Sequence, residues 1–211
     1  MSSTEDGTNR PVLEMQKGKR VKNSVFTAVI GAATLMAIAV TGAVADESTI
    51  VTDVGPFKLE DGAIAGAKKI EMDGGKWFGE ESGAPTYRVS ADGKVDFLTY
   101  RGFQRYHAEC HVCHGPEGLG STYAPALVES VKTMTYDDFV GVVASGQIRN
   151  AGGTEYVMPA LGDNKNVMCY LDGMYTYLKA RAADAIPRGR PKLKESKPKE
   201  LGQFENDCIA G

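Results

Sequence analysis

Histidine and cysteine are scarce in this chain, whose 211 residues include three histidines and four cysteines. All three histidines fall between residues 107 and 114, and two of the cysteines, Cys169 and Cys208, stand alone. This distribution argues against a zinc site, which needs further ligands at finger-like spacing. The chain also has no excess of positive charge, because its 24 Lys and Arg and 27 Asp and Glu give a formal net charge of −3. The charge balance excludes a nucleic-acid-binding protein, whose affinity rests on clustered cations.

The most informative residues form the run Cys110-His111-Val112-Cys113-His114. The C-x-x-C-H pattern is the attachment signature of a covalent c-type haem. We therefore expect one haem c, with Cys110 and Cys113 as its thioether attachment points and His114 as the proximal ligand of the iron. Two other interpretations of the run are a redox Cys-x-x-Cys pair and one half of a zinc site, and the second lacks the further ligands that it needs.

The first 45 residues are typical of a secretory signal rather than of a folded domain. Four Lys and Arg between residues 17 and 22 precede an uncharged run over residues 24–45, which ends in Ala43-Val44-Ala45. We expect export and cleavage, so that the mature protein begins at Asp46 and works in the periplasm of a bacterium. Because acidic residues precede Met15, that methionine is an alternative start of the chain.

An uncleaved membrane anchor is the alternative interpretation of the uncharged run, since the run is long enough to span a bilayer. Interspersed Gly and Thr lower its hydrophobicity, which favours a cleaved signal and no stable membrane insertion afterwards. The remaining 166 residues hold 19 Lys and Arg and 24 Asp and Glu, a formal net charge of −5. They suffice for one domain with extensions.

The mature chain is predicted to divide at about residues 96 and 182. Residues 46–96 lack a sustained helical period and predict an irregular N-terminal extension, with a hairpin turn at Ala91-Asp92-Gly93. Trp77 and Phe78 are either the anchors of this extension or ordinary aromatic residues of the core or surface. Residues 183–211 form a C-terminal strap that is rich in Lys, Arg and Pro.

The segment between the extension and the strap, residues 97–182, has helical patterns. Four residues recur at four-residue spacing and predict a first helix that ends at the haem: Leu98, Gly102, Tyr106 and Cys110. Thr135, with Asp138 three residues later, predicts the N-cap of a second helix that ends at Gly146. A third helix is predicted over residues 166–180, and it crosses the first at Gly102, where a missing side chain lets two backbones approach.

The order of these motifs resembles that of class I cytochrome c. The matching segments over residues 97–182 are Gly102-x-x-x-Tyr106-x-x-x-Cys110-x-x-Cys113-His114, Ala124-Pro125-Ala126-Leu127, Met158-Pro159 and a final helix with Tyr177-Leu178. The resemblance implies a mostly α fold with three to five helices around one covalent haem. It also implies that the Pro125 carbonyl accepts a hydrogen bond from the second ring nitrogen of His114, which orients the ring.

Five methionines follow the expected cleavage site and are candidates for the sixth ligand of the iron: Met72, Met134, Met158, Met168 and Met174. His107 and His111 lie beside the attachment site and would reach the opposite haem face only with great distortion. Met158 stands in a loop directly before Pro159, where a stiffened backbone can present its sulfur, so we expect Met158 to be the ligand. Its alternative role is to close the haem edge. A His/Met haem has no open coordination position and favours electron transfer over catalysis.

Cys169 and Cys208 remain after haem attachment, and an oxidising compartment predicts a disulfide that pins the tail to the last helix. Two buried free thiols are the alternative. Seven Lys and Arg lie between residues 181 and 199, from the end of the last predicted helix into the strap, and the three prolines of the strap resist helix formation. It is either an ordinary solvated segment or a surface that steers an acidic redox partner.

Four cysteines, an N-terminal extension and a tail closed by the last cysteine resemble a narrower group, the methanol-metabolism-related four-cysteine cytochromes c. This resemblance implies a monomeric periplasmic carrier of single electrons. Its electron donor would be a quinoprotein methanol or alcohol dehydrogenase, and its acceptor another cytochrome or a terminal oxidase. The alternative functions are a haem enzyme or ligand sensor with a labile sixth position, and an anchored subunit of a redox complex.

Overall fold

The computed structural model describes residues 55–211, so the predicted signal, its cleavage site and Met15 lie outside the described residues. The helices are α1 (Phe97–Glu109), α2 (His111–His114), the 3₁₀ helix η1 (Pro116–Gly118), α3 (Leu127–Ser130), α4 (Tyr136–Ser145), α5 (Lys165–Met168), α6 (Leu171–Ala182) and α7 (Lys199–Ala210). The strands are β1 (Phe57–Lys58), β2 (Ile64–Ala65), β3 (Ile70–Asp73), β4 (Lys76–Gly79), β5 (Arg88–Val89), β6 (Gln147–Ala151) and β7 (Thr154–Met158). These strands form three small antiparallel sheets, β1-β2-β5, β3-β4 and β6-β7.

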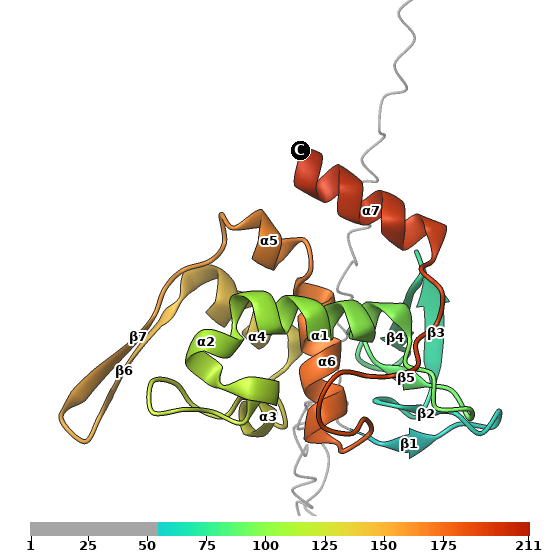
Figure 1. Cartoon of the computed structure of the whole chain (residues 1–211), viewed down its shortest axis with the longest axis horizontal. Helices are drawn as coiled ribbons and strands as arrows, with labels where there is room; N and C mark the ends of the chain where they lie inside the picture. Colours follow the sequence, from blue (N-terminus) through green and yellow to red (C-terminus); the bar gives the residue numbers. More distant parts are fainter. Residues whose placement is uncertain (1–54) are drawn as a thin grey trace, which may run out of the picture. The chain divides into compact units, whose positions relative to one another are not determined.

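The crossing of α1 and α6 forms the centre of the described fold (Figure 1). An Asp96 cap begins α1, where the Asp96 carboxylate accepts a hydrogen bond from the Thr99 N–H at 2.9 Å. Gly102 of α1 lies so close to α6 that a Cβ added to it would stand 1.7 Å from the carbonyl oxygen of Gly173. Ten of the twelve α6 residues are buried, as a helix packed on all sides requires. The predicted first helix and its close crossing at Gly102 are confirmed.

The second predicted helix is confirmed as α4. The Thr135 hydroxyl accepts a hydrogen bond from the Asp138 N–H at 3.1 Å, and the Asp138 carboxylate accepts one from the Thr135 N–H at 3.3 Å. These two bonds form a capping box, which satisfies backbone donors that a helix leaves unpaired. Gly146 ends the helix at a φ of 75°, a left-handed conformation that glycine adopts without strain.

The third helix was predicted as one element over residues 166–180, and this continuity is wrong. The structure has a short helix α5 and a long helix α6, with a break at Cys169 and Tyr170. Tyr170 leaves the helical region at a φ of −124° and a ψ of 11°. Because Val167, Leu171 and Met174 are buried on both sides of the break, the apolar pattern runs through it and hides it.

The N-terminal extension was predicted to be irregular, but residues 55–96 contain two small sheets. Most of their strands are only two residues long, which is too short for an alternating pattern to stand out in the sequence. Trp77 and Phe78 lie in β4 and are half-buried. Tyr87 is instead the fully buried aromatic residue that joins the extension to the main core.

The hairpin turn predicted at Ala91-Asp92-Gly93 is confirmed. Val89 pairs with Val95 across it, and the Ser90 N–H donates to the Lys94 carbonyl oxygen at 2.9 Å. Gly93 has a φ of 80°, which a residue with a Cβ adopts only with strain. The turn therefore delivers the chain directly to the start of α1.

The prolines of the C-terminal strap were predicted to resist helix formation, and the last part of the strap is nevertheless helix α7. The chain has no helix between α6 and Pro198, and α7 begins directly after this proline. Proline is tolerated there because the first N–H groups of a helix have no partner within the helix. Leu201 of α7 is buried against Phe97, Leu98 and Tyr100, so tertiary packing stabilises the helix.

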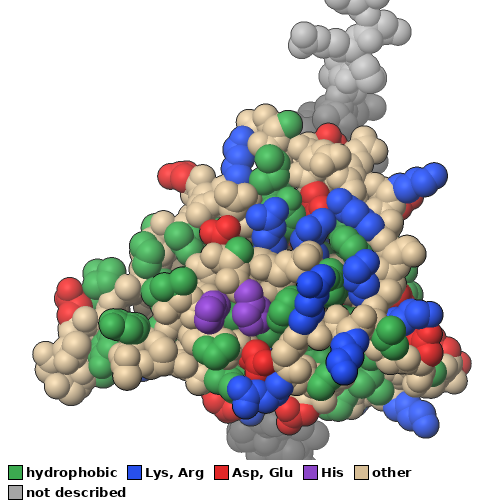
Figure 2. Space-filling model, in the orientation of Figure 1, with side chains coloured by type: hydrophobic (Ala, Val, Ile, Leu, Met, Phe, Trp, Pro, Cys, Tyr) green, Lys and Arg blue, Asp and Glu red, His purple; other side chains and the backbone are tan. Residues whose placement is uncertain are grey.

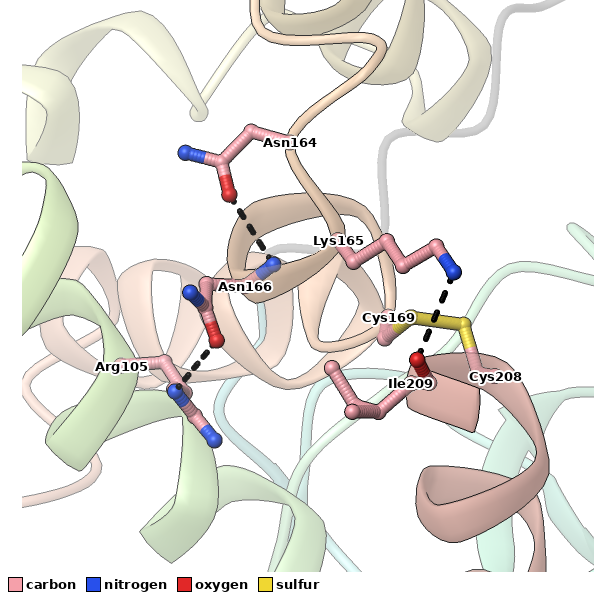
Figure 3. Close-up of a disulfide and its surroundings, with 7 residues drawn as sticks. All are labelled: Arg105, Asn164, Lys165, Asn166, Cys169, Cys208 and Ile209. Atoms are coloured by element: carbon pink, nitrogen blue, oxygen red, sulfur yellow. Dashed lines mark hydrogen bonds between the residues drawn. A yellow bond between two sulfur atoms is a disulfide. The ribbon is translucent and has the colours of Figure 1, made fainter. Parts of the chain in front are cut away.

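The predicted disulfide between Cys169 and Cys208 is confirmed, and it joins α7 to the residue that follows α5 (Figure 3). A hydrogen bond accompanies it, in which Lys165 Nζ donates to the carbonyl oxygen of Ile209 at 3.4 Å. The tail of the chain is thus fastened covalently to the helical domain.

Candidate functional site

The residues of the C-x-x-C-H run lie on a nearly continuous helical turn between α1 and α2. The Cys110 N–H donates to the Tyr106 carbonyl at 2.9 Å, and the His114 N–H donates to the Cys110 carbonyl at 3.0 Å. Cys110 and His114 therefore share a face, because residues four apart lie one above the other on a helix. Cys113 is exposed, whereas burial raises the pKa of the Cys110 thiol to about 12. The Cys110 sulfur packs 3.7 Å from the Met174 sulfur.

The ring of His114 is buried, and one hydrogen bond orients it. Its Nδ1 lies 3.0 Å from the carbonyl oxygen of Pro125, as the resemblance to cytochrome c implied. A carbonyl only accepts hydrogen bonds, so Nδ1 carries the ring proton and Nε2 keeps its lone pair for a metal ion. The Gly120 N–H donates to the His114 carbonyl at 2.8 Å and fixes the backbone on the other side.

A cavity of about 840 Å³ opens beside this turn, and its size is in the range of cofactor pockets. Cys110, Cys113 and His114 line it together with a mostly apolar wall. Large apolar side chains of this wall are Leu127, Val131, Phe139, Val143, Leu171 and Leu178. Two thiols and an imidazole nitrogen beside an apolar cavity of this size fit a covalently attached haem.

Comparison with known proteins decides the family. The chain is 50% identical over 140 residues to cytochrome c-553I of Paracoccus denitrificans, across 66% of this chain and 62% of that protein. It is 41% identical over 96 residues to cytochrome c-555 of Methylococcus capsulatus (strain ATCC 33009 / NCIMB 11132 / Bath), across 45% of this chain and 72% of that protein. The crystal structure of the c-type cytochrome XoxG from Methylobacterium extorquens AM1 matches with 54% identity and a TM-score of 0.60, covering 65% of this chain and 83% of that one. This chain belongs to the class I c-type cytochromes.

Membership of this family confirms the predicted cofactor, because c-type cytochromes carry covalently bound haem c. The family consists of electron-transfer proteins rather than enzymes, and the relatives support a kinship with the cytochromes of methanol metabolism. The cytochrome spans less than two thirds of the length of cytochrome c-553I. No protein-family model matches it.

Three of the five candidate methionines, Met134, Met158 and Met174, line the cavity of the cytochrome, and Met72 and Met168 do not. Met174 is 1% exposed and packs against Cys110, which fits the core role expected for it. Met158 is the last residue of β7 rather than part of a loop, which corrects the prediction. Its backbone lies against the end of α4, since a Cβ added to Gly146 would stand 2.6 Å from the Met158 carbonyl oxygen. Met134 precedes α4 and is the alternative ligand that the cavity offers.

Sequence analysis missed the hairpin β6-β7, which extends away from the helices (Figure 1). Gln147 pairs with Met158 and Arg149 pairs with Tyr156, and all four line the cavity. Among the described residues of this lining, Arg149 is the only Lys or Arg and Glu155 the only Asp or Glu, so Arg149 is the one cation there that can pair with a haem carboxylate. The signal for the hairpin is Gly152-Gly153, whose positive φ angles form the turn.

A buried carboxylate holds the segment that follows His114. Arg188 Nε donates to the Glu117 carboxylate at 2.6 Å, the Gly189 N–H donates to it as well, and an Arg181 nitrogen lies 3.9 Å away. Burial by itself raises the pKa of Glu117, but these hydrogen bonds and positive charges outweigh it and lower the pKa below its ordinary value. Arg181, at the end of α6, is therefore buried beside this carboxylate, whereas Arg188 of the strap binds it from a largely exposed position.

Proposed function

We propose that this cytochrome carries single electrons in the periplasm with one haem. The observation that carries the proposal is the position of His114, whose ring is oriented by Pro125 in the wall of a cavity that Met158 also lines. When bound, the haem supplies one-electron chemistry, in which its iron alternates between the ferric and ferrous states. An imidazole and a thioether together leave the iron no open position and raise its reduction potential.

Different residues of the chain attach the haem, bind its iron and surround it. Cys110 and Cys113 attach it covalently, and His114 Nε2 and Met158 Sδ are the proposed ligands of the iron. The apolar wall excludes water, which favours the less charged ferrous state. Arg149 supplies a positive charge for the haem carboxylates at the edge of the cavity.

The proposed electron donor is a quinoprotein methanol or alcohol dehydrogenase, and the proposed acceptor is a downstream cytochrome or a terminal oxidase. The resemblance to the methanol-metabolism-related four-cysteine cytochromes c supports this pairing. The disulfide between Cys169 and Cys208 fits the four-cysteine pattern of that group, because it pairs the two cysteines that do not attach the haem. We propose that the protein acts as a monomer.

The periplasm is the proposed location because disulfides persist in oxidising compartments and because a signal-like segment begins the chain. Within residues 55–211, none of the helices combines the length and the apolar character that crossing a membrane requires. Fractionation of cells that express the full chain tests this location, and we expect the haem-containing protein in the periplasmic fraction with a mature chain that begins at Asp46.

Stopped-flow mixing of the oxidised cytochrome with a reduced quinoprotein methanol dehydrogenase tests the function. We expect the haem to be reduced in a second-order phase whose rate rises with the dehydrogenase concentration. A nicotinamide-dependent alcohol dehydrogenase supplied with NADH is the control and should not reduce the haem. The reduced cytochrome should bind no carbon monoxide, since the iron has no open position. Rapid carbon monoxide binding without reduction by the dehydrogenase would instead show a ligand-binding haem protein.

A further inference from the structure

Two histidines outside the haem site lie side by side at the surface. His107 is in the last turn of α1 and His111 begins α2, and their ring centroids are 5.7 Å apart with an angle of 39° between the planes. Figure 2 shows histidine side chains gathered at one place on this face, beside Lys and Arg side chains. The backbone is helical on each side of the pair, because Cys110 and Gly115 each donate to the carbonyl four residues back, and α1 and α2 are separated only by Cys110. Residues four apart on a helix face the same way, so the two imidazoles share one surface site.

The ring of His107 is already oriented for a metal ion. Its Nδ1 lies 2.8 Å from the Phe103 carbonyl oxygen, and because a carbonyl only accepts, Nδ1 carries the proton and Nε2 keeps its lone pair. The Phe103 ring lies 4.3 Å and the Tyr177 ring 5.9 Å from the His107 ring, centroid to centroid, so aromatic packing holds the imidazole in place. Metal-binding histidines typically show this arrangement, with the second nitrogen donating to a carbonyl.

Packing accounts for His107 but not for His111. His107 fills the space beside Phe103, Tyr106 and Tyr177. Within the described part of the chain, the His111 ring contacts the His107 ring and makes no hydrogen bond. The second imidazole therefore has no hydrogen bond that competes for its nitrogens, and its ring lies beside the oriented ring of His107.

We propose that His107 and His111 bind a divalent transition-metal ion, with Cu²⁺ held most tightly. Metal–nitrogen distances of about 2.0–2.1 Å place two imidazole centroids roughly 5 Å apart, so the observed spacing needs only a small movement of one ring. Imidazole suits Cu²⁺, Ni²⁺ and Zn²⁺, and affinity among these is highest for Cu²⁺. No group of three His, Cys, Asp or Glu in residues 55–211 forms a metal site, so water completes the coordination and the ion exchanges with solvent.

Titration of the oxidised, haem-loaded cytochrome with CuCl₂ near neutral pH tests this proposal by calorimetry and by electron paramagnetic resonance. We expect the copper signal to show splitting from two nitrogens. His107→Gln and His111→Gln should each weaken Cu²⁺ binding by about tenfold or more and leave splitting from one nitrogen, since loss of a direct ligand costs at least as much as loss of its supporting partner.

His111→Gln should preserve the packing of α1, because His111 lies outside α1 and the ring contact that it makes is with His107. Intact mass and the visible spectrum verify that each variant carries its haem. Arg105→Gln, on the same helix, is the matched control and should leave the affinity unchanged. Equal Cu²⁺ affinity in the wild type and in His111→Gln, or a copper signal without nitrogen splitting, would place the ion elsewhere on the chain and refute the site.

Discussion

Met158 and Met134 line the same cavity, and the proposed His/Met coordination of the iron needs only one thioether. We expect Met158→Ala to lower the reduction potential and to remove the thioether-to-iron charge-transfer band of the oxidised protein. The reason is that a thioether ligand raises the potential of a haem, and water or a vacancy in its place does not. Visible spectroscopy and potentiometry at neutral pH measure both effects.

Met134→Ala is the matched control, and it should leave the band and the potential in place. Met174→Ala should also keep the band, but it is expected to lower the unfolding free energy by about 2–5 kcal/mol through the cavity that it leaves. The side chain of Met174 is 1% exposed, which is why its loss is felt in the core. A band that survives in Met158→Ala and disappears in Met134→Ala would overturn the ligand assignment.

Glu117 is expected to make stability depend on pH at the acidic end. Its folded pKa lies below the ordinary value of 4.5, so the stability that it contributes is present above pH 4.5 and is lost as the pH falls through the folded pKa. Glu117→Gln should lower the unfolding free energy at neutral pH by about 1.5–3 kcal/mol, the range for hydrogen bonds to a charged group. Below pH 4.5 the two proteins should converge in stability.

Urea unfolding of both proteins at a series of pH values measures this difference. Glu129→Gln is the control, because the Glu129 side chain is 67% exposed and pairs only with Lys132 at the surface. A constant difference between the wild type and Glu117→Gln at every pH would show that the carboxylate does not titrate as described.

At the scale of elements, the crossing of α1 and α6 depends on two facing glycines. Gly102→Ala would place a methyl group 1.7 Å from the Gly173 carbonyl oxygen, so the helices must separate. We expect a loss of about 1–3 kcal/mol or more of unfolding free energy, as for overpacked cores. Thermal unfolding followed by circular dichroism measures this loss.

Gly141→Ala in α4 is the matched helical control, because nothing lies within 4 Å of the Cβ it would add. It should stabilise the protein by about 0.5–1 kcal/mol, since alanine loses less backbone entropy than glycine in a helix. If Gly102→Ala stabilises the protein as Gly141→Ala does, then α1 and α6 can move apart without a loss of stability, which contradicts the prediction.

The disulfide makes the tail part of the same cooperative unit. Cys169 and Cys208 are 39 residues apart, and a closed loop of this length contributes about 4 kcal/mol in the chain-entropy model. We expect the double variant Cys169→Ser with Cys208→Ser to unfold at a lower urea concentration, because its unfolding free energy is lower by about that amount. Its haem spectrum should be unchanged because neither cysteine lines the cavity. Non-reducing peptide mapping of the wild type should recover the linked pair.

At the scale of the whole molecule, the positive charges of the strap fall into two groups. Lys197 donates to the buried Glu205 carboxylate at 2.7 Å, and Lys194 lies 5.3 Å from the ring centroids of Phe97 and Tyr100. Reversal of either charge should therefore reduce stability as well as surface potential. Figure 2 shows Lys and Arg side chains gathered on one face of the molecule, and such a surface is the kind that steers an acidic partner.

Lys192 and Lys199 are exposed and test steering without disturbing these contacts. Reversal of both to Glu should lower the association rate with an acidic electron donor and flatten its salt dependence, because charges at the rim act mainly on the on-rate. Reversal of Lys58 and Lys69 in the extension changes the net charge equally and should have a smaller effect. Stopped-flow mixing at several salt concentrations measures the association rates. An association rate that changes neither with salt nor with the strap reversals would show that the strap is an ordinary solvated segment.

What the sequence determined by itself is local chemistry. The C-x-x-C-H turn, the Thr135 cap and the end of α4 at Gly146 each depend on residues within a few positions of one another. The disulfide was also predictable, because only two cysteines remain once the haem is attached and an oxidising compartment favours their pairing. The prediction that His114 is the proximal ligand likewise needs no knowledge of the fold, because His114 directly follows Cys113 in the attachment signature.

Only the tertiary structure decided the features that depend on distant partners. Helix α7 follows a proline-rich segment and gains its stability from burial of Leu201 against α1. The break before α6 is invisible in a continuous apolar pattern, and the hairpin β6-β7 matters because it brings Arg149 and Met158 to one cavity. Likewise, Glu117 and Arg188 are 71 residues apart, so no local pattern pairs them. Such contacts become visible only when folding brings distant segments together, because sequence periodicity reports which face is buried and not which residue covers it.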